Sequence, residues 1–176
     1  MKTTALLLCA ALALSACSNR LGGGDGSLSD DGFGTGATGG IASGAAVPGS
    51  ADDPTSVAHF QQRVGDRVLF AVDQSTLSPE ARQTLDGQAA WLRSNPGFTA
   101  LVEGHADEQG TREYNLALGG RRANAVRDYL VLQGVDATRL RTISYGKERP
   151  IQVCSQEACY AQNRRSVTVL AAGAGV

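Results

Sequence analysis

Apolar residues recur at helical spacing in two stretches of the chain after residue 56. The first covers 81–92, behind a Ser-Pro-Glu start at 78–80 and ahead of an Asn-Pro-Gly stop at 95–97. A cap residue followed by proline favours a helix start, and proline with glycine favours its end. A second amphipathic helix is predicted from residue 119 or 120 to residue 133.

Short apolar runs rich in β-branched residues predict strands around these helices. A short helix or turn is expected at 57–62, a turn at 136–140, and a long loop at 146–160. The resulting order predicts an α+β domain, with helices packed on one face of a mixed four-stranded sheet. The predicted strands are 67–70, 98–102, 141–144 and 166–170.

The first residues follow another pattern. Residues 1–16 contain a lysine, an apolar run and small residues, which is typical of a secretory signal peptide. The apolar run is shorter than the roughly 20 residues that cross a membrane. Leu14-Ser15-Ala16-Cys17 resembles the bacterial lipobox, so we expect Cys17 to be lipidated and to begin the mature chain. Ser18 is compatible with outer-membrane sorting, and an ordinary signal peptide is the alternative.

Composition separates a linker from a folded domain. Eleven of the 22 glycines lie between residues 22 and 49, and residues 18–56 hold five Asp and one Arg. Such a segment cannot bury enough apolar surface to fold, so 17–56 is predicted to be a flexible linker. The domain is predicted at 57–171, followed by a tail at 172–176. The net charge of −1 argues against a nucleic-acid partner.

The stretch 102–122 carries an acid, an amide and a base. Asp107 follows an apolar run in a loop near glycines, and Arg122 lies near the start of the second predicted helix. Asn115 stands between them. Asp107 can accept from an ammonium group and Arg122 can donate to a carboxylate, so the pair suits a ligand with both groups. The alternative is that Asp107 caps the following turn and pairs with Arg122 structurally.

A metal site or a hydrolase would need more than the acids near this stretch. Glu103, His105, Asp107 and Glu108 include common ligand types, but the other histidine, His59, is distant in sequence. Neither a zinc-protease pattern nor a nucleophile elbow is present. We therefore expect no catalytic residue, metal or cofactor, with a periplasmic hydrolase as the alternative.

Two cysteines and a basic triplet remain near the end of the chain. In an oxidising periplasm, Cys154 and Cys159 are expected to form a disulfide, and a metal pair is the alternative. Asn163-Arg164-Arg165 is interpreted as a helix end, with positive charge near the last carbonyl groups.

Five motifs follow one another along the predicted domain: GHADEQGT at 104–111, YN at 114–115, RRA at 121–123, SYGKERP at 144–150 and QNRRSV at 162–167. In this order and spacing they resemble the OmpA-like C-terminal domain family over residues 68–170. The resemblance implies a non-catalytic domain that binds meso-diaminopimelate in the stem peptide of peptidoglycan. It assigns the ligand pair to Asp107 and Arg122, a further contact to Asn115, and first-loop contacts near Phe70, Val72 and Asp73.

The lipobox and linker add to this resemblance. Within the family they are similar to the peptidoglycan-associated lipoproteins of the Tol system. This implies an outer-membrane lipoprotein, anchored by acylated Cys17, that tethers the membrane to the cell wall. It also implies TolB and other Tol proteins as partners and a role in cell division. A wall-binding OmpA-like lipoprotein without a Tol partner is the alternative.

The chain departs from the family pattern in three places. Ala71 and Gln109 stand where many relatives have an acid and an arginine, respectively. Gly119 and Gly120 stand where most have Ser-Glu or Gly-Glu. Because glycine disfavours helix, we expect these two glycines to weaken the helix start that aims Arg122.

Overall fold

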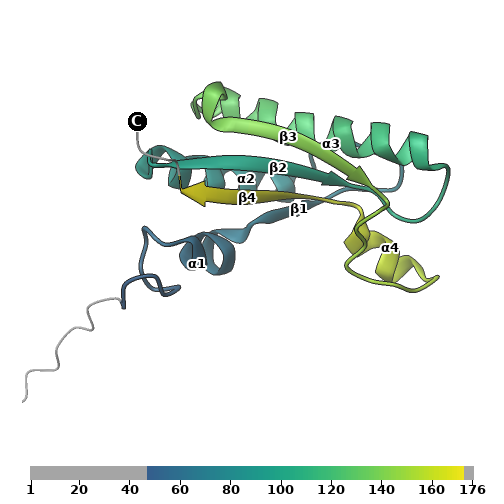
Figure 1. Cartoon of the computed structure of the whole chain (residues 1–176), viewed down its shortest axis with the longest axis horizontal. Helices are drawn as coiled ribbons and strands as arrows, with labels where there is room; N and C mark the ends of the chain where they lie inside the picture. The colour runs from purple at the N-terminus through teal and green to yellow at the C-terminus, as the bar shows by residue number, and fades with distance from the viewer. Residues whose placement is uncertain (1–46, 173–176) are drawn as a thin grey trace, which may run out of the picture. The chain divides into compact units, whose positions relative to one another are not determined.

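The computed structural model describes residues 47–172 (Figure 1). The predicted signal peptide, the lipidation site Cys17, the linker up to residue 46 and the end of the tail lie outside the described residues. The elements are α1 (Val57–His59), η1 (Phe60–Gly65), β1 (Arg67–Leu69), α2 (Pro79–Ser94), β2 (Phe98–His105), α3 (Arg112–Leu132), η2 (Ala137–Arg139), β3 (Leu140–Gly146), α4 (Glu157–Asn163) and β4 (Arg165–Ala172).

The strands form one mixed sheet in the order β1-β4-β2-β3. β2 pairs antiparallel with β4 on one side and parallel with β3 on the other, and β1 pairs antiparallel with β4. Ala100 and Val102 of β2 lie opposite Leu170 and Thr168 of β4, so these residues point to one face. The predicted α+β class with a mixed four-stranded sheet is confirmed.

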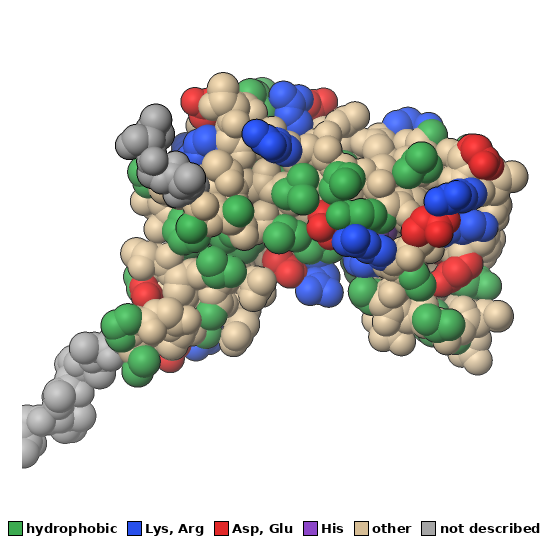
Figure 2. All heavy atoms as spheres, in the orientation of Figure 1, with side chains coloured by type: hydrophobic (Ala, Val, Ile, Leu, Met, Phe, Trp, Pro, Cys, Tyr) green, Lys and Arg blue, Asp and Glu red, His purple; other side chains and the backbone are tan. Residues whose placement is uncertain are grey.

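Helices α2 and α3 cover that face of the sheet (Figure 1). Their apolar stripes meet Val68, Ala100 and Val102 in one core. On the opposite face, hydrophobic side chains are exposed among charged ones (Figure 2). The helical residues of the core are Ala81, Leu85, Ala89, Trp91 and Leu92 from α2, and Ala123, Val126 and Leu130 from α3.

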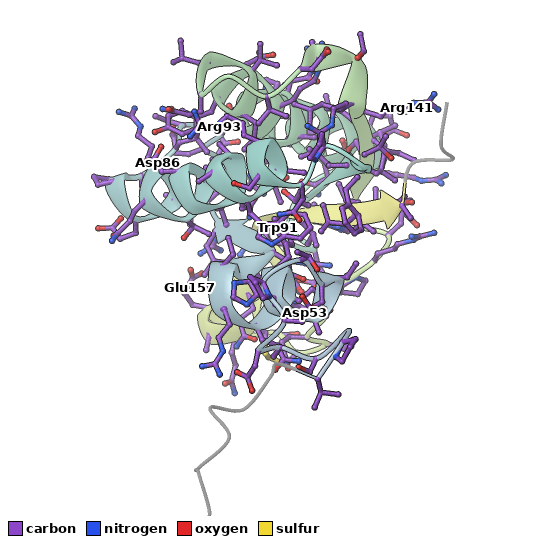
Figure 3. The ribbon with its side chains drawn as sticks, turned by 90° about the vertical axis from the view of Figure 1, so that its left-hand side faces the viewer. Asp53, Asp86, Trp91, Arg93, Arg141 and Glu157 are labelled. Carbon is purple, nitrogen blue, oxygen red and sulfur yellow. A yellow bond between two sulfur atoms is a disulfide. The ribbon has the colours of Figure 1, made fainter. Side chains whose placement is uncertain are left out.

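Helix α2 forms where the sequence predicts it. The Ser78 side chain accepts a hydrogen bond from the Ala81 amide at 3.2 Å, and Pro79 is the first helical residue. The Trp91 indole donates to the Pro54 carbonyl at 2.8 Å. Figure 3 shows Trp91 on α2 near the N-terminal turns that carry Asp53. The described structure therefore begins with turns that pack on α2, ahead of Val57.

Helix α3 begins at Arg112, two turns before the predicted start. Its cap is Thr111, whose side chain accepts from the Tyr114 amide at 3.2 Å. The expectation of a weak start at Gly119 is therefore wrong, because this glycine lies inside the helix. A Cβ on Gly119 would lie 2.8 Å from the Gly104 carbonyl oxygen, and a Cβ on Gly104 would lie 1.8 Å from the Gly119 oxygen. Both glycines are needed for α3 to touch β2.

The predicted long loop at 146–160 contains part of a helix, which corrects the expectation of an irregular segment. Helix α4 starts at Glu157 inside that loop. The Asn163 side-chain oxygen accepts from the amides of Ile151 and Gln152 at 2.9 and 3.1 Å. This buried amide organises the segment in front of α4. Residues 47–172 include no helix with the length and hydropathy needed to cross a membrane.

Candidate functional site

The predicted ligand residues, except Phe70, meet at one pocket beside the carboxyl end of β2. The pocket has a volume of about 260 Å³ and is lined by Asp73, Asp107, Asn115 and Arg122. A larger hollow of about 560 Å³ adjoins the first turn of α3, but none of these four residues lines it. The other residues of the smaller pocket are Val72, Gln109, Gly110, Tyr114 and Leu118.

Three separate segments supply these side chains. Asp107 follows the end of β2, and Asp73 lies in the loop between β1 and α2. Asn115 and Arg122 both lie on α3, about two helical turns apart, so they project from the same face. The contact of α3 with β2 at Gly119 brings this face to the loop that carries Asp107.

Arg122 is fully buried, with 0% of its surface exposed. Its Nε donates to the Gln74 carbonyl at 2.8 Å, and one Nη donates to the His105 carbonyl at 2.8 Å. The other Nη donates to the Ala71 carbonyl at 3.2 Å. The guanidinium also lies over the Phe70 ring, 5.2 Å from its centroid. Arg122 therefore joins the first loop to the end of β2.

The remaining hydrogen-bonding capacity of Arg122 suits a carboxylate. Arginine has five N–H groups, and the three bonds to carbonyl oxygens leave two, one on each terminal nitrogen. Burial lowers the pKa of Arg122 to about 10, although nearby Asp107 raises it. The group stays charged at neutral pH, and none of its three described acceptors is anionic.

Asp107 is nearly buried, with 8% of its surface exposed, and it is paired with Arg164. One carboxylate oxygen accepts from an Nη of Arg164 at 3.1 Å, and the other accepts from the Gln109 amide at 3.3 Å. Asp107 thus caps the following turn, as the structural alternative predicted. The partner in that alternative is wrong, because the ion pair is with Arg164 and not with Arg122.

Asn115 holds the loop that forms the pocket rim. It is 1% exposed, and its side-chain nitrogen donates to the Gln109 carbonyl at 2.7 Å. Gly110 follows with a φ of 89°, a conformation that favours glycine. Lys147 reinforces the same loop by donating to the Gly110 carbonyl at 2.8 Å. Asn115 therefore lines the pocket and also stabilises the loop at its rim.

Two of the predicted first-loop residues, Asp73 and Phe70, differ in their position relative to the pocket. Asp73 lines it, has a φ of 56°, and accepts a hydrogen bond from the Tyr114 hydroxyl. Such a backbone conformation is unfavourable for a residue with a side chain. Phe70 is buried beneath Arg122 and does not line the pocket. Phe70 supports the arginine, whereas Asp73 can face a ligand.

Sequence reasoning missed Tyr114, Leu118 and Arg164. Tyr114 and Leu118 lie on the pocket face of α3, eight and four residues before Arg122. The Thr111 cap could have revealed them, because a helix that starts there puts all three positions on one face. Arg164 carries no such local signal, since its contact with Asp107 spans 57 positions.

His105 and Glu108 belong to the scaffold of the site. The His105 ring is 1% exposed, and burial together with Arg165 and Arg149 lowers its pKa to about 4. Glu108 accepts a hydrogen bond from the Asn163 side chain at 2.7 Å. Within residues 47–172, no three His, Cys, Asp or Glu side chains are grouped to hold a metal. Cys154 and Cys159 form the predicted disulfide.

Sequence comparison identifies the family of the chain. The family model described as OmpA family matches residues 69–164, so the chain belongs to the OmpA family. A peptidoglycan-associated lipoprotein of Rhizobium meliloti is 50% identical over 164 residues, covering 93% of this chain and 84% of that protein. Another, from Pseudomonas aeruginosa, is 44% identical and covers 93% of both chains.

Solved structures agree with this family. The crystal structure of the peptidoglycan-associated lipoprotein from Burkholderia pseudomallei is similar with a TM-score of 0.61 and 38% identity. The match covers 68% of this chain and 98% of that one. The C-terminal domain of Helicobacter pylori MotB is similar with a TM-score of 0.58 at 20% identity, over 62% of this chain and 86% of that one. The MotB likeness supports the fold alone.

Proposed function

We propose that this protein is an envelope lipoprotein that binds peptidoglycan non-covalently through meso-diaminopimelate of the stem peptide. The observation that carries the proposal is a pocket in which Arg122 has two free N–H groups beside the carboxylates of Asp107 and Asp73. The relatives named peptidoglycan-associated lipoprotein support the choice of ligand.

The chemistry of diaminopimelate fits these groups. The end of its side chain carries an ammonium and a carboxylate on one carbon. The carboxylate can take the two remaining N–H groups of Arg122, and the ammonium can donate to Asp107 or Asp73. Asn115 and Gln109 shape the rim against which the rest of the residue lies. The role of the protein is binding and positioning, without a reacting group.

Entry of the ligand requires a side chain to move. Arg122 lines the pocket but has no exposed surface in this conformation. Tyr114 of α3 and Asp73 of the first loop reach each other by a hydrogen bond, from two different walls of the pocket. We expect this hydrogen bond to break when a ligand carboxylate approaches Arg122.

The proposal extends to the place of the protein in the envelope. Acylation at Cys17 would anchor the chain in the outer membrane, because several acyl chains hold a protein more firmly than one. A flexible linker ahead of residue 47 would let the domain reach the wall, since residues 47–56 form turns that pack on α2. The likeness to peptidoglycan-associated lipoproteins supports membership of the Tol–Pal system, with TolB as a partner and a role in cell division.

The test is co-sedimentation of the full chain, purified in detergent, with cell-wall sacculi. Asp107→Asn and Arg122→Lys should each weaken binding about tenfold or more, since a charge-assisted hydrogen bond is worth roughly 1.5–3 kcal/mol. Arg127→Lys is the matched control, because Arg127 lies on the same helix in an exposed ion pair with Asp128. Circular dichroism checks that each variant is folded.

The ligand itself separates the possibilities. Sacculi with lysine in place of diaminopimelate lack the carboxylate for Arg122, so they should bind weakly, and free meso-diaminopimelate should compete with wall binding. Equal binding of both wall types would contradict the proposal. Capture of TolB from periplasm would support the Tol assignment, and its failure would favour a wall-binding lipoprotein outside that system. Release of soluble wall fragments would instead indicate a hydrolase.

A further inference from the structure

We infer that Arg164 positions Asp107 for the ligand, and that Glu157 offsets part of the positive charge that Arg164 presents to the pocket. Glu157 lies in the turn that the Cys154–Cys159 disulfide closes, called the disulfide-closed turn below. This inference rests on the proposed function, because it assigns two further residues and a covalent constraint to the same pocket. It gives a role to the cysteine pair and to the basic triplet, neither of which the binding of a ligand by Asp107 and Arg122 requires.

Arg164 is a buried residue with fixed contacts. It is 4% exposed, its Nη1 donates to Asp107 at 3.1 Å, and its Nε donates to the Phe70 carbonyl at 3.3 Å. Its Nη2 donates to the carboxylate of Glu157. Arg164 therefore fixes the carboxylate that the ligand ammonium needs, and it also contacts Phe70, whose ring lies beneath Arg122.

Glu157 reaches Arg164 from inside a closed ring of the chain. The Cys154–Cys159 disulfide joins two cysteines five positions apart, and Glu157 lies between them as the first residue of α4. The side chain of Glu157 is 64% exposed, so burial does not hold it in place. The cap residue Gln156 makes no side-chain hydrogen bond to α4. Glu157 is the first residue of α4 and Arg164 is its C-cap, so the helix places them on one side, and the disulfide closes the turn from which this short helix starts.

A second contact links the same segment to the pocket loop. Asn163, at the end of α4, donates from its side chain to Glu108 at 2.7 Å. Glu108 is the residue after Asp107. Asn163, the last residue of α4, and the following residue Arg164 thus hold two consecutive residues of the pocket loop, Glu108 and Asp107. Movement of the disulfide-closed turn would therefore shift Asp107 through the hydrogen bonds of Asn163 and Arg164.

The charges around Arg164 predict whether loss of Glu157 strengthens or weakens ligand binding. Burial alone would lower the pKa of Arg164, but hydrogen bonds to Glu157 and Asp107 outweigh it and raise the pKa above its ordinary value. The negative charge of Glu157 offsets part of the positive potential that Arg164 produces at the pocket. Without Glu157, the potential around Asp107 would be more positive and would disfavour a ligand ammonium. Loss of Glu157 or of its constraint should therefore weaken binding.

The experiment compares reduced and oxidised protein. A dithiol such as dithiothreitol breaks the Sγ–Sγ bond, supplies two electrons and two protons to form two thiols, and is itself oxidised to a cyclic disulfide. With diaminopimelate-type sacculi, reduction of the wild-type chain should weaken binding about two- to fivefold, the range expected for a partly exposed ion pair. Glu157→Gln should weaken binding by a similar factor without reduction.

The decisive result is the combination of the two changes. If reduction acts by releasing Glu157, the Glu157→Gln variant should bind equally well with and without dithiol. Glu148→Gln is the matched control, because Glu148 forms an exposed ion pair with Arg112 outside the pocket. This control should respond to reduction as the wild type does. The inference would be overturned if the fold-losses in wall binding caused by reduction and by Glu157→Gln multiplied in the combined experiment. It would also be overturned if neither change weakened binding.

A direct measurement keeps this result separate from failure of the proposed function. In NMR spectra of the full chain, the Nε–H signal of Arg164 should shift on reduction and in Glu157→Gln, but not in Glu148→Gln. The signal that is missing from the spectrum of Arg164→Lys identifies the Nε–H resonance of Arg164. An unchanged Arg164 signal would refute the link even if the wall is bound. A shifted signal without wall binding would retain the link and contradict the proposed ligand.

Discussion

Two buried arginines serve the pocket in opposite ways: Arg122 lines it, and Arg164 lies behind it, paired with Asp107. Arg122 donates to three backbone carbonyl oxygens, and burial lowers its pKa to about 10. Arg164 donates to the carboxylates of Asp107 and Glu157, which raise its pKa despite burial. One charge is held by neutral dipoles, whereas the other is matched by two anions.

The difference indicates which arginine can receive an anionic ligand. A buried cation without an anionic partner is unfavourable, so an arriving carboxylate stabilises it. Arg164 already has such partners and has little to gain from a ligand. Arg122 has two N–H groups left and therefore combines a structural role with a binding role. The two residues are identical in type, so only their surroundings distinguish them.

The largest expected effect separates the two arginines by stability. Arg122→Ala should lower the free energy of unfolding by about 3–5 kcal/mol, because it leaves three carbonyl oxygens without donors. Arg164→Ala should lower it by about 3 kcal/mol, because Asp107 would then be buried without its partner. Urea denaturation measures both losses.

A second substitution distinguishes the causes. Asp107→Asn should recover about 1–2 kcal/mol of unfolding free energy in the Arg164→Ala background, since it removes the unpaired charge. The same substitution should recover nothing in the Arg122→Ala background. Equal recovery in both backgrounds would mean that the two arginines share one role, and the comparison would fail.

His105 gives the next effect, because its carbonyl accepts from Arg122 while its ring lies near Arg165 and Arg149. The folded pKa of about 4 is below the unfolded value of about 6.5, so the folded state favours the neutral ring. This contribution is complete above pH 6.5 and is lost as the pH falls through 4. Urea denaturation should show a loss on the order of 3 kcal/mol over that window, absent in His105→Gln.

Gly119 sharpens the comparison by testing what aims Arg122. Gly119→Ala should lower the free energy of unfolding by about 1–3 kcal/mol, because its Cβ would lie 2.4 Å from the Ser144 hydroxyl and 2.8 Å from the Gly104 oxygen. It should also weaken wall binding by shifting α3. Gly120→Ala is the control, since its nearest contact would be at 3.9 Å. This variant should gain about 0.5–1 kcal/mol in the free energy of unfolding from helix propensity. A decrease instead would mean that Gly120, like Gly119, is needed for the contact of α3 with the sheet.

The smallest effect is expected at an exposed arginine. Arg112 pairs with Glu148 at 3.1 Å, and their side chains are 73% and 49% exposed. Water and salt screen such a pair, so Glu148→Gln should leave the urea midpoint unchanged. A marked loss there would show that exposure does not separate the arginines of this protein as the comparison assumes.

Local features of the chain were sufficient for some elements. Helix α2 follows from Ser78 at its cap, Pro79 in its first turn and Asn95 at its end, because capping depends on neighbours within four residues. The start of α3 was misplaced because Gly119 has low helix propensity. Packing on Gly104 outweighs that propensity, and the two residues are not close in sequence.

The sequence by itself determined the four-stranded α+β class, the disulfide pair and the position of Asp107 after a strand and of Arg122 on a helix. Tertiary structure decided the rest: the start of α3, the free donors of Arg122, and the pairing of Asp107 with Arg164. The physical reason is that residue type specifies which bonds a side chain can make. Which partner it meets depends on segments brought together by the packing of α3 and α4 around the end of β2.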